Sequence, residues 1–291
     1  MKILVTGANG NLGSKIVEYL LTKLSVEEII VGVRNDQSEK AQNYKEQGLE
    51  VRLTDFENPD TLITAFTGVD RLFIISTFGD YETIMRQHTN AVNAAKVTGV
   101  KQVIYPSVTR AEGNDFFLAG MHRAREITII ESGIPYVILR NNWYIENELG
   151  TIHGCIAGAP WVNSAGEGKI GWVYRPDLAE AAANVLVAEG HKHENKIYEL
   201  SGENLTQQQF VDTLNELLDQ KISLLTVDDA TYEEMLKGSG VPEPYLPMLV
   251  MTQKGIRDGG LESLHSDLDF LLERKATPLK QALVQLLGNS K

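Results

Sequence analysis

The chain has 291 residues, of which 43% are hydrophobic and 23% charged, a composition typical of globular proteins that excludes a disordered or fibrous chain. Its 27 basic and 39 acidic side chains give a net charge of −12, which disfavours nucleic acid as a partner because a phosphate backbone would be repelled. The sequence holds no apolar stretch long enough to cross a bilayer and no signal-peptide pattern. The single cysteine, Cys155, can form neither an internal disulfide nor a thiolate metal site. We therefore expect a cytoplasmic protein with no nucleic-acid or membrane partner.

The first half of the chain alternates short apolar runs with amphipathic segments. The apolar runs predict strands at residues 2–6, 28–33, 50–53, 71–75, 102–106 and 136–139. Between the runs, apolar residues recur at helical spacing, first at Leu12, Ile16, Leu20 and Leu24, and later at Ile84, His88, Ala91, Val92 and Ala95. Continuously apolar strands joined by helices predict an α/β fold with a doubly wound parallel Rossmann sheet. Ligands of such sheets lie beyond the carboxyl ends of the strands.

After Asn142 the pattern changes. Glycine-rich loops are predicted over residues 150–171, and mostly helical segments at 176–189, 206–219, 228–238 and 278–287. A strand at 196–200 is expected to return to the main sheet. We therefore expect a dinucleotide-binding Rossmann domain at 1–141 and a smaller, helix-rich substrate lobe at 142–291, interleaved with the first domain.

The strongest motif is the sequence TGANGNLG at residues 6–13, named here the glycine turn, which directly follows the first strand and opens the first helix. Gly7 would allow the tight turn, Gly10 the close approach of a pyrophosphate, and Gly13 the close packing of helix on strand. This context predicts a dinucleotide site. The residues assigned to the cofactor are Gly7, Asn9, Gly10, Asn11, Leu12 and Gly13.

The end of the second strand normally decides between NAD and NADP. Arg34 lies about 20 residues after Gly13, where the discriminating side chain belongs, and its guanidinium suits the 2′-phosphate of NADP. The alternative is that Arg34 only faces solvent while Asp36 accepts the ribose hydroxyls of NAD. NADP is the prediction that we favour.

Polar and aromatic residues near the ends of later strands complete the predicted cofactor site. Asp55 and Phe56 could flank the adenine, and Ser76 and Thr77 would lie near the ribose beside the nicotinamide. Ser107, just beyond the predicted fifth strand, is assigned to the same site. Residues at such strand ends also serve as helix caps or turn residues, and that alternative stays open.

Several motifs together resemble the NmrA-like family of atypical short-chain dehydrogenases/reductases, and the resemblance covers most of the chain. It is closest to the family's bacterial NADPH-dependent quinone reductases and triphenylmethane reductase. The motifs are the glycine turn, VRN at 33–35, LRNNWY at 139–144 with Glu146 and Asn147, GKI at 168–170, RPDLA at 175–179, YELSG at 198–202 and ATPL at 276–279.

The resemblance implies an NADPH-binding domain and hydride transfer to a small quinone-like or conjugated acceptor. The family also includes redox sensors that bind the dinucleotide without known turnover, so a non-catalytic NADP(H)-binding regulator is the first alternative. A nucleotide-sugar epimerase or dehydrogenase, which shares the fold, is the second.

The Tyr-x-x-x-Lys pair of the wider superfamily is missing from its usual position. The only such spacing, Tyr19 to Lys23, falls on the first helix, behind the glycine turn. At the expected position stand His122 and Glu126, as in the quinone reductase branch, and we predict that Glu126 accepts a hydrogen bond from a catalytic His122 on the same helix face. The alternative is a partly exposed helix face with an ion pair. Without the Tyr/Lys pair, quinone reduction is favoured over alcohol oxidation or epimerisation, which need a base to remove a hydroxyl proton.

Two aromatic residues, Trp143 and Tyr144, follow the sixth strand and would form a shelf for a flat acceptor, so Tyr144 joins the catalytic candidates. His191 and His193 lie close together, but the sequence has no helical zinc motif, and we predict no metal site.

Overall fold

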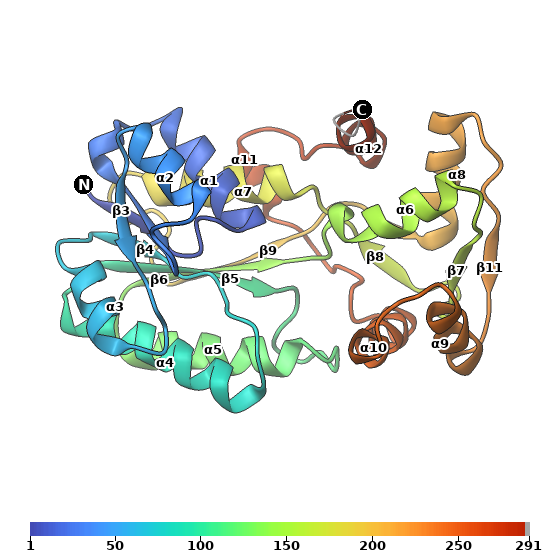
Figure 1. Cartoon of the computed structure of the whole chain (residues 1–291), viewed down its shortest axis with the longest axis horizontal. Helices are drawn as coiled ribbons and strands as arrows, with labels where there is room; N and C mark the ends of the chain where they lie inside the picture. The colour runs from blue at the N-terminus through green and yellow to red at the C-terminus, as the bar shows by residue number, and fades with distance from the viewer. Residues whose placement is uncertain (289–291) are drawn as a thin grey trace.

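A computed structural model describes residues 1–288 and has a seven-stranded, all-parallel sheet at its centre (Figure 1). In spatial order its strands are β3 (Glu50–Leu53), β2 (Ile29–Val33), β1 (Ile3–Val5), β4 (Arg71–Phe73), β5 (Gln102–Val108), β6 (Tyr136–Asn141) and β9 (Lys196–Leu200). The order reverses between β1 and β4, which is the position where doubly wound sheets bind their ligands. The predicted fold class is confirmed.

Helices cover both faces of the sheet (Figure 1). On one face lie α1 (Asn11–Leu21), α2 (Glu39–Glu46), α7 (Arg175–Val187) and α11 (Leu268–Leu272), and on the other α3 (Pro59–Phe66), α4 (Tyr81–Val97) and α5 (Ala119–Ser132). Successive side chains of a strand point to opposite faces. Ile3 and Val5 of β1 accordingly pack in the core with α1 and α7, whereas Leu4 packs in the core with α3 and α4.

Two strands extend beyond their predicted ends. β5 continues past Pro106 to Val108, and β6 runs to Asn141, because the two strands keep pairing as far as Val108 and Asn141. β4 pairs with β5 only as far as Ile104, so Pro106 lies where β5 needs no further N–H on that side. Ser107 therefore lies inside a strand rather than after one.

Apart from α7, β9 and α11, the second half of the chain forms a lobe beside the carboxyl ends of β5 and β6 (Figure 1). Its helices are α6 (Leu149–Ile156), α8 (Gln207–Leu218), α9 (Asp229–Gly238), α10 (Leu246–Arg257) and α12 (Leu279–Gly288). Its strands are β7 (Trp161–Asn163) paired with β11 (Leu224–Thr226), and β8 (Lys169–Gly171) paired with β10 (Asn204–Thr206). Helix α6 and strands β7 and β8 replace the loops expected over 150–171. Burial of Ile152 and Cys155 in the lobe's own core outweighs the low helix propensity of the glycines in α6.

None of the helices in residues 1–288 combines the length and the apolar content that a bilayer crossing needs.

Candidate functional site

The glycine turn connects β1 to α1 with a backbone that requires glycine at two positions. Gly7 adopts a φ of +60°, in the left-handed region that favours glycine. A Cβ on Gly13 would collide with the carbonyl oxygen of Gly7 and lie 3.0 Å from the Cα of Ala8. Gly10 is the N-cap of α1 and has no side-chain cap, so the first N–H groups of the helix keep their capacity to bind an anion.

Asn9 ties the glycine turn to the segment after β2. Its Nδ2 donates to Ser38 Oγ at 2.9 Å, and its backbone oxygen accepts from Lys40 Nζ at 2.9 Å. Its Oδ1 is buried and has no partner among residues 1–288. Of the other predicted contacts, Asn11 is exposed at the start of α1, whereas Leu12 packs against the sheet core. An orphaned acceptor, an uncapped helix start and a turn with no room for a Cβ at Gly13 all fit a dinucleotide.

The two side chains that could choose between NAD and NADP have different surroundings. Arg34 is exposed and makes no hydrogen bond or ion pair with any residue in 1–288. The Asp36 carboxylate lies 3.7 Å from Lys45 Nζ. Together with Lys40, Arg34 places positive charge beside the glycine turn, which favours a phosphate over a ribose hydroxyl there.

The residues predicted to flank the adenine are engaged within the protein. Asp55 Oδ1 accepts from the backbone N–H of Glu57 at 3.0 Å, which is a turn-forming contact before α3. Phe56 is 6% exposed and belongs to the core under α3 and α4. The turn role that the sequence left open is thus present, and an adenine contact for either residue stays a prediction.

His122 lies at the start of α5, where its ring contacts a polar cluster at the carboxyl edge of the sheet. Its Nδ1 is 2.9 Å from the hydroxyl of Tyr105 on β5, and that hydroxyl is 3.1 Å from Ser76 Oγ. Arg125 Nη1 donates to the same hydroxyl at 3.4 Å, and Arg125 Nη2 donates to the backbone oxygen of Thr77 at 3.4 Å. We name Ser76, Tyr105, His122 and Arg125 the Tyr105 cluster.

Burial, the positive charge of Arg125 and the neighbouring His88 together lower the pKa of His122 to about 3. His122 is therefore neutral at physiological pH, and it can serve as a hydrogen-bond donor or acceptor but not as a cationic acid.

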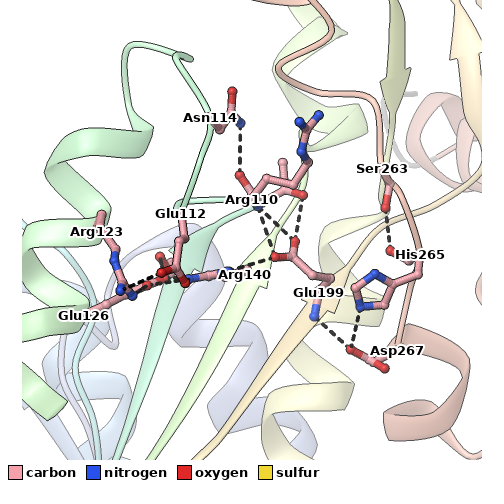
Figure 2. A network of polar contacts seen from close by, with 12 residues as sticks. Arg110, Glu112, Asn114, Arg123, Glu126, Arg140, Glu199, Ser263, His265 and Asp267 are labelled. Carbon is pink, nitrogen blue, oxygen red and sulfur yellow. Dashed lines mark hydrogen bonds and ion pairs between the residues drawn. The ribbon is translucent and has the colours of Figure 1, made fainter.

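The predicted hydrogen bond between His122 and Glu126 is wrong. Glu126 is fully buried, and its carboxylate accepts from Arg140 Nε at 2.8 Å and Nη2 at 2.7 Å and from Arg123 Nη1 at 3.1 Å (Figure 2). It also accepts from Ser107 Oγ at 2.7 Å. The i, i+4 spacing does put both residues on α5, but a buried carboxylate needs a charged partner, and β6 supplies Arg140. Ser107 thereby has a partner inside the protein, and its cofactor contact stays a prediction.

The same network joins the sheet to the lobe (Figure 2). Arg140 Nη1 also donates to Glu199 on β9 at 3.2 Å, and both oxygens of Glu199 accept from the backbone N–H of Arg110 at 3.2 and 3.0 Å. Arg110 Nη1 in turn donates to the backbone oxygen of Gly259 at 2.8 Å, and Asn114 Nδ2 donates to that of Gly260 at 2.8 Å. The loop after β5 is thus fixed between the two parts of the molecule.

Tyr144 follows β6 at the ligand edge of the sheet. Its hydroxyl accepts from Asn141 Nδ2 at 3.2 Å, burial raises its pKa, and the Arg175 guanidinium lies 5.1 Å from its ring centre. Asn141 is 5% exposed, and its Oδ1 has no partner in residues 1–288, so a buried acceptor lies beside Tyr144. Trp143 instead donates to Glu148 at 3.0 Å and packs edge-to-face on Phe116.

Sequence reasoning missed Tyr105, Arg125 and Asn141. Tyr105 and Asn141 lie in apolar strands and Arg125 on a helix already assigned to His122, so no local spacing singled them out. Tyr105 and Asn141 could have been found as polar residues in otherwise apolar strands, because a polar group that is buried there needs a hydrogen-bond partner. No group of three or more His, Cys, Asp or Glu side chains able to hold a metal ion exists in the described part of the chain.

Comparison with known proteins identifies the family. The NmrA-like family model matches residues 1–280. The chain is 34% identical to quinone oxidoreductase 2 of Escherichia coli over 98% of its own length and 99% of that protein. Among solved structures, it is similar to Citrobacter sp. triphenylmethane reductase complexed with NADP(H) (TM-score 0.92, 34% identity, 98% of this chain and 99% of that one). It is equally similar to an NADPH-dependent quinone oxidoreductase from E. coli complexed with NADPH (TM-score 0.91, 34% identity, the same coverage). The match of the family model over nearly the whole chain, supported by these relatives, shows that the protein belongs to the NmrA-like family.

Proposed function

We propose that this protein is an NADPH-dependent reductase that transfers a hydride to a quinone or a similar conjugated small molecule. The observation that carries the proposal is the placement of a neutral His122 at the ligand edge of the sheet, in a chain whose glycine turn fits a dinucleotide and which lacks the Tyr/Lys pair. The relatives named as quinone oxidoreductase 2 and triphenylmethane reductase support it.

Residues 1–141 would act as the dinucleotide-binding domain and residues 142–291 as the substrate lobe. The glycine turn would bind the pyrophosphate through the uncapped N–H groups of α1, and Arg34 with Lys40 would bind the 2′-phosphate. Ser76 and Thr77 would contact the ribose beside the nicotinamide. The buried Oδ1 of Asn141 is an acceptor suited to the carboxamide N–H group of the nicotinamide.

When bound, NADPH supplies the hydride, which carries two electrons to the acceptor. A quinone that receives the hydride needs one further proton to become a hydroquinone, and solvent can supply it. The reaction therefore needs no base that removes a hydroxyl proton, which agrees with the missing Tyr/Lys pair. His122 would donate a hydrogen bond to the acceptor's carbonyl oxygen as negative charge develops there, and Tyr144 would offer its ring to a flat acceptor.

We place the protein in the cytoplasm. NADPH-dependent reduction suits that compartment, and so does a fold whose single cysteine is buried and unpaired.

The test is a titration of the purified protein with NADPH and with NADH, followed by absorbance at the nicotinamide band after a simple quinone is added. We expect preferential binding of NADPH and its steady consumption once the quinone is present. Tight NADPH binding with no consumption across a panel of quinones, dyes and other conjugated acceptors would contradict the catalytic proposal and favour a dinucleotide-binding sensor.

A His122→Ala variant separates the role of His122 from cofactor binding. We expect unchanged NADPH affinity and a kcat lower by about a hundredfold. The matched control is His153→Ala, since His153 is an exposed residue of α6 that makes no contact with the Tyr105 cluster. Full activity of His122→Ala would remove His122 from the mechanism.

A further inference from the structure

A neutral imidazole carries one hydrogen, and the nitrogen that holds it decides what His122 can offer an acceptor. If the hydrogen is on Nε2, that nitrogen donates outward. The Nε2 of His122 has no hydrogen-bond partner among residues 1–288, whereas Nδ1 lies 2.9 Å from the Tyr105 hydroxyl. The tautomer of His122 therefore depends on whether the Tyr105 hydroxyl donates its hydrogen to Nδ1 or accepts one from it.

Arg125 constrains that direction. A guanidinium is only a donor, so the Tyr105 oxygen accepts from Arg125 Nη1 and keeps its single hydrogen for another partner. The candidates are His122 Nδ1 at 2.9 Å and Ser76 Oγ at 3.1 Å, and a serine hydroxyl can itself donate to Tyr105. In one arrangement Ser76 and Arg125 donate to Tyr105 and Tyr105 donates to His122, so that the Tyr105 oxygen accepts two hydrogen bonds and its single hydrogen goes to Nδ1.

The charge of Arg125 strengthens this arrangement. Arg125 is 2% exposed, its Nε has no partner, and no carboxylate of residues 1–288 forms an ion pair with it. Its positive charge is therefore little screened and acts on the side chains next to it. It makes the Tyr105 hydroxyl a stronger donor and disfavours a hydrogen on Nδ1 of His122. His88 on α4 packs edge-on against the Tyr105 ring and binds the backbone oxygen of Arg125 through Nε2 at 3.2 Å, which fixes both residues.

We propose that Tyr105, polarised by the buried Arg125, is a positioning residue that holds His122 in the Nε2–H form, so that His122 presents an N–H group to the acceptor's carbonyl oxygen. The catalytic part of this inference rests on the proposed reductase function. The positioning part does not, because it concerns only the free protein.

The first test reads the His122 tautomer directly by two-bond ¹H–¹⁵N NMR on the ¹⁵N-histidine-labelled protein at neutral pH, with His122→Gln used to assign the signal. We expect the Nε2–H pattern in the wild type and a mixture of the two neutral tautomers in Tyr105→Phe, which removes only the hydroxyl. Tyr136→Phe is the matched control, since Tyr136 lies on the neighbouring strand and its hydroxyl contacts none of the Tyr105 cluster. An Nδ1–H pattern in the wild type, or an unchanged pattern in Tyr105→Phe, overturns the inference.

Ser76→Ala provides a second variant should Tyr105→Phe fail to fold. If Tyr105 donates to His122, removal of the serine hydroxyl leaves the Nε2–H pattern in place. If instead Tyr105 donates to Ser76 in the wild type, the variant changes the pattern and the inference is wrong.

The kinetic test uses the same variants with NADPH and a quinone. We expect Tyr105→Phe to lower kcat by about tenfold to a hundredfold while the KM for NADPH stays unchanged, because His122 loses its orientation but the cofactor site is intact. A tautomer change without a fall in kcat overturns the catalytic role of the positioning. A wild type that consumes no NADPH contradicts the reductase proposal, whereas the NMR result still decides whether Tyr105 sets the tautomer.

Discussion

Arg140 and Glu126 form a buried, two-pronged ion pair, with Arg140 Nε and Nη2 donating to the two carboxylate oxygens at 2.8 and 2.7 Å (Figure 2). Glu126 has no exposed surface and Arg140 is 7% exposed. Such a pair is costly to break, since the partner that remains keeps a charge out of water. Because Arg140, Arg123 and Ser107 occupy the Glu126 carboxylate, we expect Glu126 to act structurally, and the catalytic role expected from its spacing to His122 stays a prediction.

Glu126→Gln is therefore expected to destabilise the protein. We expect its free energy of unfolding, measured in urea, to fall by about 3 kcal/mol, because Arg140 and Arg123 lose a charged partner. Glu112→Gln is the control, because Glu112 is 64% exposed and its bond to Arg123 is worth about 0.5 kcal/mol or less. A Glu126→Gln protein that is as stable as the wild type but inactive would restore the catalytic interpretation.

Gly13→Ala tests the glycine turn. The added Cβ has no space against the Gly7 carbonyl oxygen and the Ala8 Cα, so the turn must deform. We expect NADPH affinity, measured by fluorescence titration, to fall by more than about tenfold. Gly150→Ala, a helical position where a Cβ would meet no atom within 4 Å, should bind NADPH normally and be more stable by about 0.5–1 kcal/mol. Equal NADPH affinity of the two variants would mean that the dinucleotide does not bind at the glycine turn.

Arg34→Ala tests the choice of dinucleotide. Arg34 has no partner in residues 1–288, so its removal should leave stability unchanged but weaken NADPH binding by about tenfold or more, since the 2′-phosphate loses a charge-assisted hydrogen bond. NADH binding should not change. Arg86→Ala, an exposed arginine paired with Glu57 on the α3 and α4 face, is the control. An equal loss of NADH affinity would show that Arg34 does not bind the 2′-phosphate of NADPH.

His88 makes stability depend on pH. Burial and the nearby Arg125 lower the pKa of His88 to about 3, whereas the unfolded chain titrates near 6.5, so between these values the unfolded state binds more protons. The stability that the neutral His88 contributes is thus fully present above pH 6.5 and is lost as the pH falls toward 3.

The contribution of this single residue is bounded by about 1.4 kcal/mol per pH unit. We expect His88→Gln to unfold with a shallower dependence on pH between 6.5 and 4.5 in urea titrations than the wild type does. His153→Gln, whose ring stays in water, serves as the comparison. Identical slopes for wild type and His88→Gln would rule out a neutral His88 in the folded state.

The sequence by itself determined the features that depend on local periodicity. Continuous apolar runs specified the strands of a sheet covered on both faces, and helical spacing specified the packing face of α1, because each signal lies within one element and its flanking turns. The glycine turn predicted a dinucleotide site for the same reason. The same local spacing predicts Arg34 as the 2′-phosphate contact, since its distance from Gly13 is a property of one βαβ unit, and that contact stays a prediction.

Tertiary structure decided the partners of the buried polar side chains. Glu126 pairs with Arg140 from β6, and His122 with Tyr105 from β5, and neither choice follows from spacing along α5. A buried charge or imidazole takes the partner that desolvation and geometry allow, and that partner lies on a strand brought alongside only when the sheet forms. The same holds for α6. Its glycines predicted a loop, but burial of Ile152 in the core of the lobe stabilises a helix there.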